Sequence, residues 1–389
     1  MRLITKKIRN IINDMDKPLL FVTIVFFIFG LLNIVTASSR EAVSLNVPLY
    51  YYFFKQSEML LIGLVGAIFI INFDTRKYYK YAFIAFVVIT VLLLYSLAAA
   101  NETRGALNWI NLFGFTFQPS EFAKPVIIVC LALIFEKTSS KLRDKSAPHR
   151  DIIATIIVAG CAIPAIIFLQ KDFGTMFIIF CIFLVMFFAS PILRIEKVKT
   201  IGLLTGLVFV AGFMMFSIKG HILTEAQLAR FSFFNPCSDY EHGGYQVCNG
   251  FIAINDGGLF GLGIGKSKQK YSYIPEPHTD LVFSIIAEEY GLLKVFPIFI
   301  VYLFILYRIL NLSSKANTIR GRYMCLGVAT YIFMHILVNL GGLFGVMPLT
   351  GVSLPFLSYG GSFTITLMCS LALVQRVHIE TRNQKIKIK

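Results

Sequence analysis

The sequence predicts an all-α protein that crosses a membrane many times, and three observations support that prediction. Of the 389 residues, 57% are hydrophobic and only 15% are charged. The mean hydropathy of +0.73 indicates more apolar surface than a water-soluble fold can bury. Long apolar segments alternate with shorter polar connections. Since a spanning helix needs about 20 mostly apolar residues, ten segments are candidate spans.

Seven candidate spans come before the longest polar region, 218–280, and three come after it. They lie near residues 18–37, 57–73, 81–99, 121–136, 151–169, 175–191, 200–217, 294–312, 323–341 and 362–377. The break between the fifth and sixth spans is very short, and the span after Asp280 could begin as early as Leu281. We expect one membrane domain over the whole chain, with polar tails at 1–17 and 378–389.

The distribution of lysine and arginine predicts the orientation of these spans. Most of the 36 Lys and Arg residues lie in the two tails and in the connections 74–80, 137–150, 192–199 and 308–322. Cytoplasmic loops carry such an excess, so we expect both tails in the cytoplasm and an even number of spans. The N-terminal tail is not typical of a cleavable signal peptide. Contact with anionic lipid explains the net charge of +15 without nucleic acid.

This orientation places the long loop, 218–280, outside the cytoplasm. Loops of such length are usually functional or disordered, and its many Gly and aromatic residues disfavour disorder. We expect a short amphipathic helix near 245–256 and then a Gly-rich turn that carries Lys266 and Lys270. Glycines let backbone N–H groups approach a phosphate closely, which would suit a lipid-linked phosphate. Taken alone, however, these residues fit a flexible surface loop better.

Two of the seven cysteines, Cys237 and Cys248, lie in this loop. On the oxidising side of the membrane they could form a disulfide, and two unpaired thiols are the alternative. A metal site is not expected there, because His242 is the only histidine between them. The chain also lacks a Walker motif, a dinucleotide fingerprint and an HExxH motif, so ATP-driven transport by this chain is not expected.

Polar side chains at the ends of spans are candidates for function. Trp109, the only tryptophan, precedes the span 121–136 and could be an interfacial anchor. Lys124 lies about one turn inside that span, where a cation is costly and usually paired or functional, unless it snorkels to the surface. Lys171 and Asp172 lie between two apolar runs and could form an ion pair or face a polar cavity.

The segment 347–364 contains two prolines and several glycines between spans. Irregular backbone at membrane depth is tolerated only where it is buried in protein or lines a cavity. Ser358 offers a hydroxyl group there. We therefore expect this segment to border a polar site.

The segment YSYIPEPHTDLVFSIIAEE, 271–289, gathers titratable groups where a polar loop becomes apolar: Glu276, His278, Asp280, Glu288 and Glu289. Thr279 or Asp280 could cap a helix that begins at Leu281. A carboxylate at the membrane boundary could also act as a general base, whose pKa burial would raise and nearby cations would lower. The local sequence leaves both roles open.

Together these segments resemble the SEDS family of polytopic peptidoglycan polymerases, typified by FtsW and RodA. The likeness covers nearly the whole chain and is carried by GALNWINL, FQPSEFAK, LQKDFGT, GYQVCNGFIAINDGGLFGLGIGKS, PEPHTDLVF with AEEYG, and LPFLSYGGS. Several of these motifs are weak alone, but they are specific in this order and spacing. Ala37 and Ser38 after the first span, the loop GIGKSKQKYSYIPE and AEEYG are closer to FtsW and its sporulation-associated relatives than to RodA.

The resemblance implies a glycosyltransferase of the bacterial cytoplasmic membrane that polymerises lipid II, a disaccharide-pentapeptide on undecaprenyl pyrophosphate. A sugar hydroxyl of lipid II would attack the growing chain with inversion at the anomeric carbon. This reaction needs one base on the hydroxyl, and the family's PExHTDF motif puts that base at Asp280. The FtsW-like features favour a role in cell division. The implied partners are a class B penicillin-binding protein transpeptidase and other division or elongation proteins.

The resemblance also implies roles for further residues. The candidate substrate-binding residues are Trp109, Lys124, Arg230, Lys266, Lys270, Glu276, His278 and Ser358, and the candidate supporting residues are Glu121, Asp172 and Glu288. Two positions depart from the family pattern: Asn108 replaces a basic residue, and Lys171 replaces a proline. A divalent cation could assist at the pyrophosphate, but the sequence contains no dedicated metal cage.

Two other functions remain open. A lipid II flippase or other transporter, also proposed for this family, would need ionisable groups near the bilayer midplane and often has inverted repeats. Here the acidic cluster is expected toward the outer face, and no repeat is evident. The other alternative is a non-catalytic scaffold for a transpeptidase.

Overall fold

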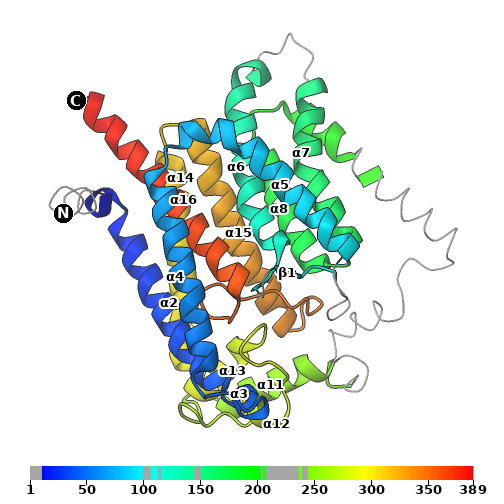
Figure 1. The fold of residues 1–389 in the computed structure, drawn as a ribbon, viewed down its shortest axis with the longest axis vertical. Coiled ribbons are helices and arrows are strands. Elements are labelled where there is room, and N and C mark those ends of the chain that lie inside the picture. Colours follow the sequence, from blue (N-terminus) through cyan, green and yellow to red (C-terminus); the bar gives the residue numbers. More distant parts are fainter. Residues whose placement is uncertain are drawn as a thin grey trace, which may run out of the picture.

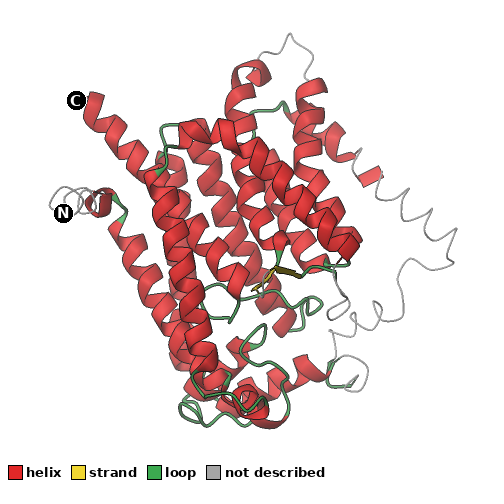
Figure 2. Ribbon diagram, in the orientation of Figure 1, coloured by secondary structure: helices red, strands yellow, loops and turns green. Residues whose placement is uncertain are grey.

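A computed structural model describes residues 11–99, 107–112, 115–143, 150–202, 205–206, 236–238 and 244–388. In this part of the chain, long helices form one bundle and the only strands make a short hairpin (Figure 2). The long helices are α2 (Lys17–Ala37), α4 (Tyr51–Asn72), α5 (Tyr78–Ala99), α6 (Pro119–Arg143), α7 (Arg150–Leu169), α8 (Phe173–Ala189), α14 (Leu292–Lys315), α15 (Ile319–Leu343) and α16 (Gly361–Ile388). Each covers one expected span, which confirms the all-α membrane fold. The remaining expected span, 200–217, lies almost entirely outside the described residues.

Seven helices in the described part of the chain are long and apolar enough to cross a membrane. They are α2, α4, α5 with its preceding turn, α7, α14, α15 and most of α16. The eighth apolar helix, α8, is shorter, and α6 carries charged residues in the turns at its two ends. The protein is therefore a multi-pass membrane protein, as its composition predicts.

The helix α16 extends well beyond the apolar segment that predicts it. It continues to Ile388, through residues that the sequence pattern assigns to a polar tail. These added turns are rich in Glu, Gln, Lys and Arg, which favour helix without contributing hydropathy. Hydropathy therefore places the span correctly and misses the length of the helix.

The centre of the bundle is α15, which packs against α6, α8, α14 and α16 (Figure 1). Gly327 permits this close packing, because a Cβ atom there would lie 2.6 Å from Ile128 of α6 and 3.0 Å from Met186 of α8. Most residues of α15 are buried. A polar side chain on this helix must therefore find its partners inside the protein.

The shorter elements lie at one end of the bundle (Figure 1). They are α3 (Ser39–Ser44), α11 (Tyr245–Gly257), α12 (Gln269–Ser272) and α13 (Val282–Tyr290). The position of α11 confirms the short helix expected near 245–256. A disulfide joins Cys237 to Cys248 of α11, with their Cα atoms 5.0 Å apart. A single 3-10 turn, Thr75–Lys77, connects α4 to α5 at the other end.

The apolar run after Asp280 forms two helices instead of one. Gly291 ends α13 with a φ of +80°, a conformation that glycine adopts without strain. A Cβ atom at Gly291 would lie 2.3 Å from the backbone nitrogen of Gly261. The spanning helix α14 therefore begins at Leu292, and the segment before it packs as a separate short helix.

Candidate active site

Asp280 lies half-buried in the turn that precedes α13. Its carboxylate accepts a hydrogen bond of 2.8 Å from the hydroxyl group of Thr279. The helix begins at Val282, and its cap residue, Leu281, makes no side-chain hydrogen bond. The interpretation that Thr279 or Asp280 caps a helix beginning at Leu281 is therefore wrong. The helix starts one residue later, at Val282, and Leu281 occupies the cap position.

The central helix α15 fixes the backbone that carries Asp280. The side-chain nitrogen of Asn339 donates to the carbonyl groups of Asp280, at 2.7 Å, and of Val352, at 2.8 Å. One helical turn earlier, Nδ1 of His335 lies 3.0 Å from the carbonyl oxygen of Ser353. Two polar side chains of α15 thus hold the loop between α15 and α16 beside the turn that contains Asp280.

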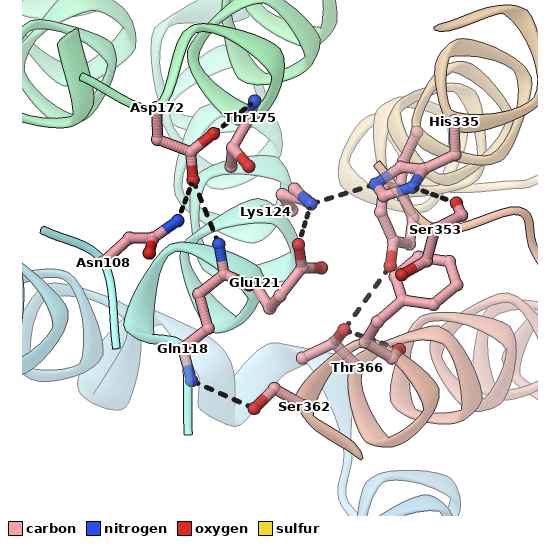
Figure 3. A network of polar contacts seen from close by, with 12 residues as sticks. Asn108, Gln118, Glu121, Lys124, Asp172, Thr175, His335, Ser353, Ser362 and Thr366 are labelled. Carbon is pink, nitrogen blue, oxygen red and sulfur yellow. Dashed lines mark hydrogen bonds and ion pairs between the residues drawn. The ribbon is translucent and has the colours of Figure 1, made fainter. Parts of the chain in front are cut away.

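A buried ion pair lies against the same helix (Figure 3). The ammonium group of Lys124 is 2.6 Å from Oε1 of Glu121 and 2.9 Å from Nε2 of His335. It also lies 5.7 Å from the ring centre of Tyr331. Lys124 is completely buried, so it does not snorkel to the surface. The pairing that a cation in an apolar helix requires is present.

Asp172 occupies the other side of the cluster in Figure 3. It caps α8 by accepting a hydrogen bond of 3.1 Å from the backbone of Thr175. It also accepts from the side-chain amides of Asn108, at 2.7 Å, and Gln118, at 3.0 Å. Lys171 is exposed, with a φ of +62°. Asn108, the residue that departs from the family pattern, therefore has a defined contact.

Several residues that complete this cluster had no role predicted from their sequence pattern. The backbone of Gln118 donates to the hydroxyl of Ser362 at 3.0 Å, which joins the hairpin region to α16. Gln56 of α4 donates to Thr364 of α16 at 2.8 Å. A usable signal existed for His335 and Asn339, which lie one turn apart inside an apolar span, because polar residues at such positions usually face partners or a cavity.

Aromatic rings hold the segment that leads into Asp280. His278 is buried, with its ring centre 4.5 Å from that of Tyr52 and 5.3 Å from that of Tyr359. The backbone of Tyr359 donates to the carbonyl of His278 at 2.8 Å. Glu276 is half-buried with a φ of +45°. The Thr279 hydroxyl that contacts Asp280 also lies 2.8 Å from the carbonyl oxygen of Glu276, so this one group contacts both ends of the turn.

Two charged candidates lie inside the protein instead of on its surface. Lys270 is completely buried, with its ammonium group 2.6 Å from Glu289. The buried carboxylate of Glu288 accepts from the hydroxyl of Ser267 and from the backbone of Lys268, the latter at 2.7 Å. These contacts attach the Gly-rich turn and α12 to α13. In this structure both charged groups therefore stabilise the loop.

The remaining candidate substrate-binding residues differ in their exposure to solvent. Trp109 is 39% exposed just before β1 (Ile110–Leu112), which pairs with β2 (Phe115–Phe117). Ser358 is buried, and its hydroxyl oxygen accepts a hydrogen bond of 2.8 Å from the backbone of Leu354. Lys266 is exposed, and Arg230 lies outside the described residues. In the described part of the chain, no three His, Cys, Asp or Glu side chains come together as a metal site.

The family model of cell cycle proteins named for FtsW, RodA and SpoVE matches residues 17–383. The chain belongs to this family. It is 33% identical to the probable peptidoglycan glycosyltransferase FtsW of Bacillus subtilis (strain 168), over 98% of this chain and 95% of that protein. It is 35% identical to the FtsW protein of the same description from Enterococcus hirae, over 75% of this chain and 72% of that protein. These relatives agree with the FtsW-like motifs.

Solved structures of FtsW/RodA-type proteins show the same fold. A chain from the structure described as "Structural coordination of polymerization and crosslinking by a peptidoglycan synthase complex" is 25% identical and has a TM-score of 0.72, covering 94% of this chain and 97% of that chain. The rod shape determining protein RodA of Thermus thermophilus is 26% identical, with a TM-score of 0.67 and coverage of 94% and 96%. The fold that the motifs imply is therefore confirmed.

Proposed function

We propose that this protein is a peptidoglycan glycosyltransferase that polymerises lipid II during cell division. The likeness to FtsW glycosyltransferases along 98% of the chain carries this proposal. The half-buried carboxylate of Asp280, which accepts a hydrogen bond from the hydroxyl group of Thr279, adds chemical support. A constrained carboxylate of this kind is suited to general base catalysis.

In the proposed reaction, Asp280 accepts the proton of the acceptor sugar hydroxyl as that oxygen attacks the anomeric carbon of the donor chain. The new glycosidic bond forms while the bond from that carbon to undecaprenyl pyrophosphate breaks, and the pyrophosphate leaves with the bonding electrons. A single displacement inverts the anomeric centre and needs no covalent intermediate. The hydrogen bond from Thr279 orients the carboxylate for this step.

Charge stabilisation at the leaving pyrophosphate is assigned to cations of the loop 218–280. Lys266 and Arg230 are the candidates, since Lys124 and Lys270 are both completely buried and ion-paired. Lys124 and Lys270 then support the site through the elements that they fix. Trp109, Glu276, His278 and Ser358 are proposed to shape the substrate cavity, with Glu121, Asp172 and Glu288 behind them.

The proposed topology places both tails in the cytoplasm and the loop 218–280 with Asp280 on the outer face, where lipid II is polymerised. The excess of Lys and Arg in the tails and alternate connections supports this orientation. We propose a class B penicillin-binding protein transpeptidase as partner. The likeness to a chain of a complex that coordinates polymerisation and crosslinking supports this choice.

The test is polymerisation of labelled lipid II by the purified protein with its transpeptidase partner in detergent. Asp280→Asn should reduce the rate of glycan formation at least about a hundredfold, the usual contribution of a general base. Asp256→Asn is the matched control, because Asp256 lies in α11 outside the candidate site, and it should retain the activity. Unchanged polymerisation by Asp280→Asn would refute the base assignment. Lipid II translocation in vesicles without polymer would favour a transporter instead.

A further inference from the structure

The Gly-rich segment after α11, Gly258–Lys268, is hydrogen-bonded to the beginning of the spanning helix α14. We call this segment the clasp. Four backbone hydrogen bonds of 2.9–3.1 Å join it to α13 and α14: Leu292 to Gly258, Leu293 to Leu259, Leu262 to Glu288 and Gly263 to Glu289, with the donor named first. The contact is close, since a Cβ atom at Gly261 would lie 2.4 Å from the carbonyl oxygen of Glu289. The segment is therefore held at the level where α14 begins.

Three large apolar side chains of this clasp are exposed. Leu259, Phe260 and Ile264 have exposed fractions of 61%, 71% and 64%. Water would hydrate all three side chains unless something apolar covers them, and burial of each such side chain is favourable by about 1.5–3 kcal/mol. A cluster of this kind marks an interaction surface.

The exposed side chains continue the outer face of α14. That face presents residues at spacings of three and four: Leu293, Phe296, Ile300, Leu303 and Tyr307. The opposite face of α14, which includes Ile298 and Ile305, is buried in the bundle. Because the backbone of Leu293 donates to the carbonyl group of Leu259, the exposed apolar face of α14 is continuous with the exposed side chains of Gly258–Lys268.

Three lysines border the same apolar surface. Lys294 donates to the carbonyl of Phe260 at 3.2 Å, and Lys266 and Lys268 lie at the end of the clasp. The nearest buried carboxylates are occupied by other groups, as the pairing of Glu289 with Lys270 shows. Within the part of the chain that the structure describes, none of the three lysines forms an ion pair. Their charges are therefore available to anions outside the protein.

We propose that Gly258–Lys268 is an interfacial anchor that lies in the headgroup layer of the bilayer. Its apolar side chains enter the boundary of the acyl chains, and Lys266, Lys268 and Lys294 bind lipid phosphate groups. Apolar residues bordered by cations at the end of a spanning helix are suited to this position. The anchor also fixes the height of α13 and Asp280 relative to the membrane surface. The apolar side chains, Lys268 and Lys294 do not depend on the activity proposed for the chain, and Lys266, a candidate for the leaving pyrophosphate, is the one residue that the two proposals share.

Tryptophan quenching in vesicles without lipid II tests the apolar part. Phe260→Trp in a Trp109→Phe background gives a single reporter, and Ile264→Trp gives an independent second one. Lipids brominated on the acyl chain should quench both reporters, whereas aqueous acrylamide should quench them weakly. Leu303→Trp, on the outer face of α14, is the lipid-embedded reference. Strong quenching by acrylamide and weak quenching by brominated lipid would overturn the anchor. That result would show that the side chains lie in water, where they could bind a protein partner instead of lipid.

Quenching of the same tryptophans by lipids with different headgroups tests the phosphate contacts. Brominated phosphatidylglycerol, diluted into phosphatidylcholine, should quench more strongly than brominated phosphatidylcholine at equal dilution. Replacing Lys266, Lys268 and Lys294 by Gln should lower this preference about fivefold for each lysine removed. Lys315→Gln, at the other end of α14, is the control and should leave the preference unchanged. If the two brominated lipids quenched the protein that retains all three lysines equally, the lysines would not bind lipid phosphate.

Discussion

The side-chain amide of Asn339 donates a hydrogen bond of 2.7 Å to the backbone carbonyl of Asp280. The same nitrogen donates to Val352 at 2.8 Å. Asn339 is almost completely buried in α15, the helix at the centre of the bundle. The turn that carries the candidate base is therefore attached directly to a largely buried helix at the centre of the bundle.

Replacement of Asn339 tests whether this attachment positions the base. Asn339→Leu leaves two carbonyl groups without their donor, which costs about 1–3 kcal/mol for each unsatisfied buried group. We expect polymerisation at saturating lipid II to fall at least about tenfold while KM changes little. Asn72→Leu is the control, because the side chain of Asn72 donates to Ile68 of its own helix, at 2.8 Å. A lower Tm with unchanged kcat would show that Asn339 only stabilises the fold.

The buried pair of Lys124 and Glu121 predicts an asymmetric response to mutation. Lys124→Met leaves the Glu121 carboxylate without its cation, and breaking a buried pair from one side costs about 3–5 kcal/mol. Lys124→Met combined with Glu121→Gln removes both charges, so it should recover part of that loss. Unfolding of the single and double variants in detergent measures the difference. Equal stabilities would show that the two side chains are not coupled.

The sequence predicts the spans well because hydropathy is a property of each segment by itself. It does not predict the separate helix α13, because that break depends on the contact between Gly291 and Gly261, which are distant along the chain. The sequence also does not predict the contacts of His335 and Asn339, since these contacts depend on which loop folds against α15. The predicted helix start, Leu281, is one residue before the observed start, Val282, so the residue at the cap position is Leu281 and not Asp280. Its role as the base stays a prediction.

The disulfide predicts a stability that depends on redox conditions. Cys237 and Cys248 are 11 positions apart, and closing a loop of that size stabilises a fold by about 2–3 kcal/mol. Dithiothreitol should therefore lower the Tm of the native chain. The variant with Cys237→Ser and Cys248→Ser should begin at the lower Tm and show no response to dithiothreitol. A response that persists in this variant would place the redox-sensitive group at another cysteine.

The contact between Asp16 and Arg308 predicts how stability changes in acid. Burial raises the pKa of Asp16, but hydrogen bonds from Arg308 and from the Leu19 backbone outweigh it, so the pKa lies below its ordinary value. The closest contact, from Nη2 of Arg308 to Oδ2, is 2.7 Å. The ionised form is thus favoured in the folded protein. Its contribution is complete above the unfolded pKa, about 4, and is lost as pH falls through the lower folded value.

Asp16→Asn should therefore lower the Tm at pH 7 and have a progressively smaller effect as the pH falls below about 4, where the native carboxylate becomes protonated. The difference in Tm between the two proteins, measured from pH 7 to pH 3, checks this expectation. Asp151→Asn is the control, because Asp151 is exposed in the first turn of α7, and its effect should be small throughout. If the loss of Tm in Asp16→Asn stayed constant down to pH 3, the ionised pair with Arg308 would not be its source. The cause would then be packing at the start of α2, where Asp16 caps the helix through Leu19.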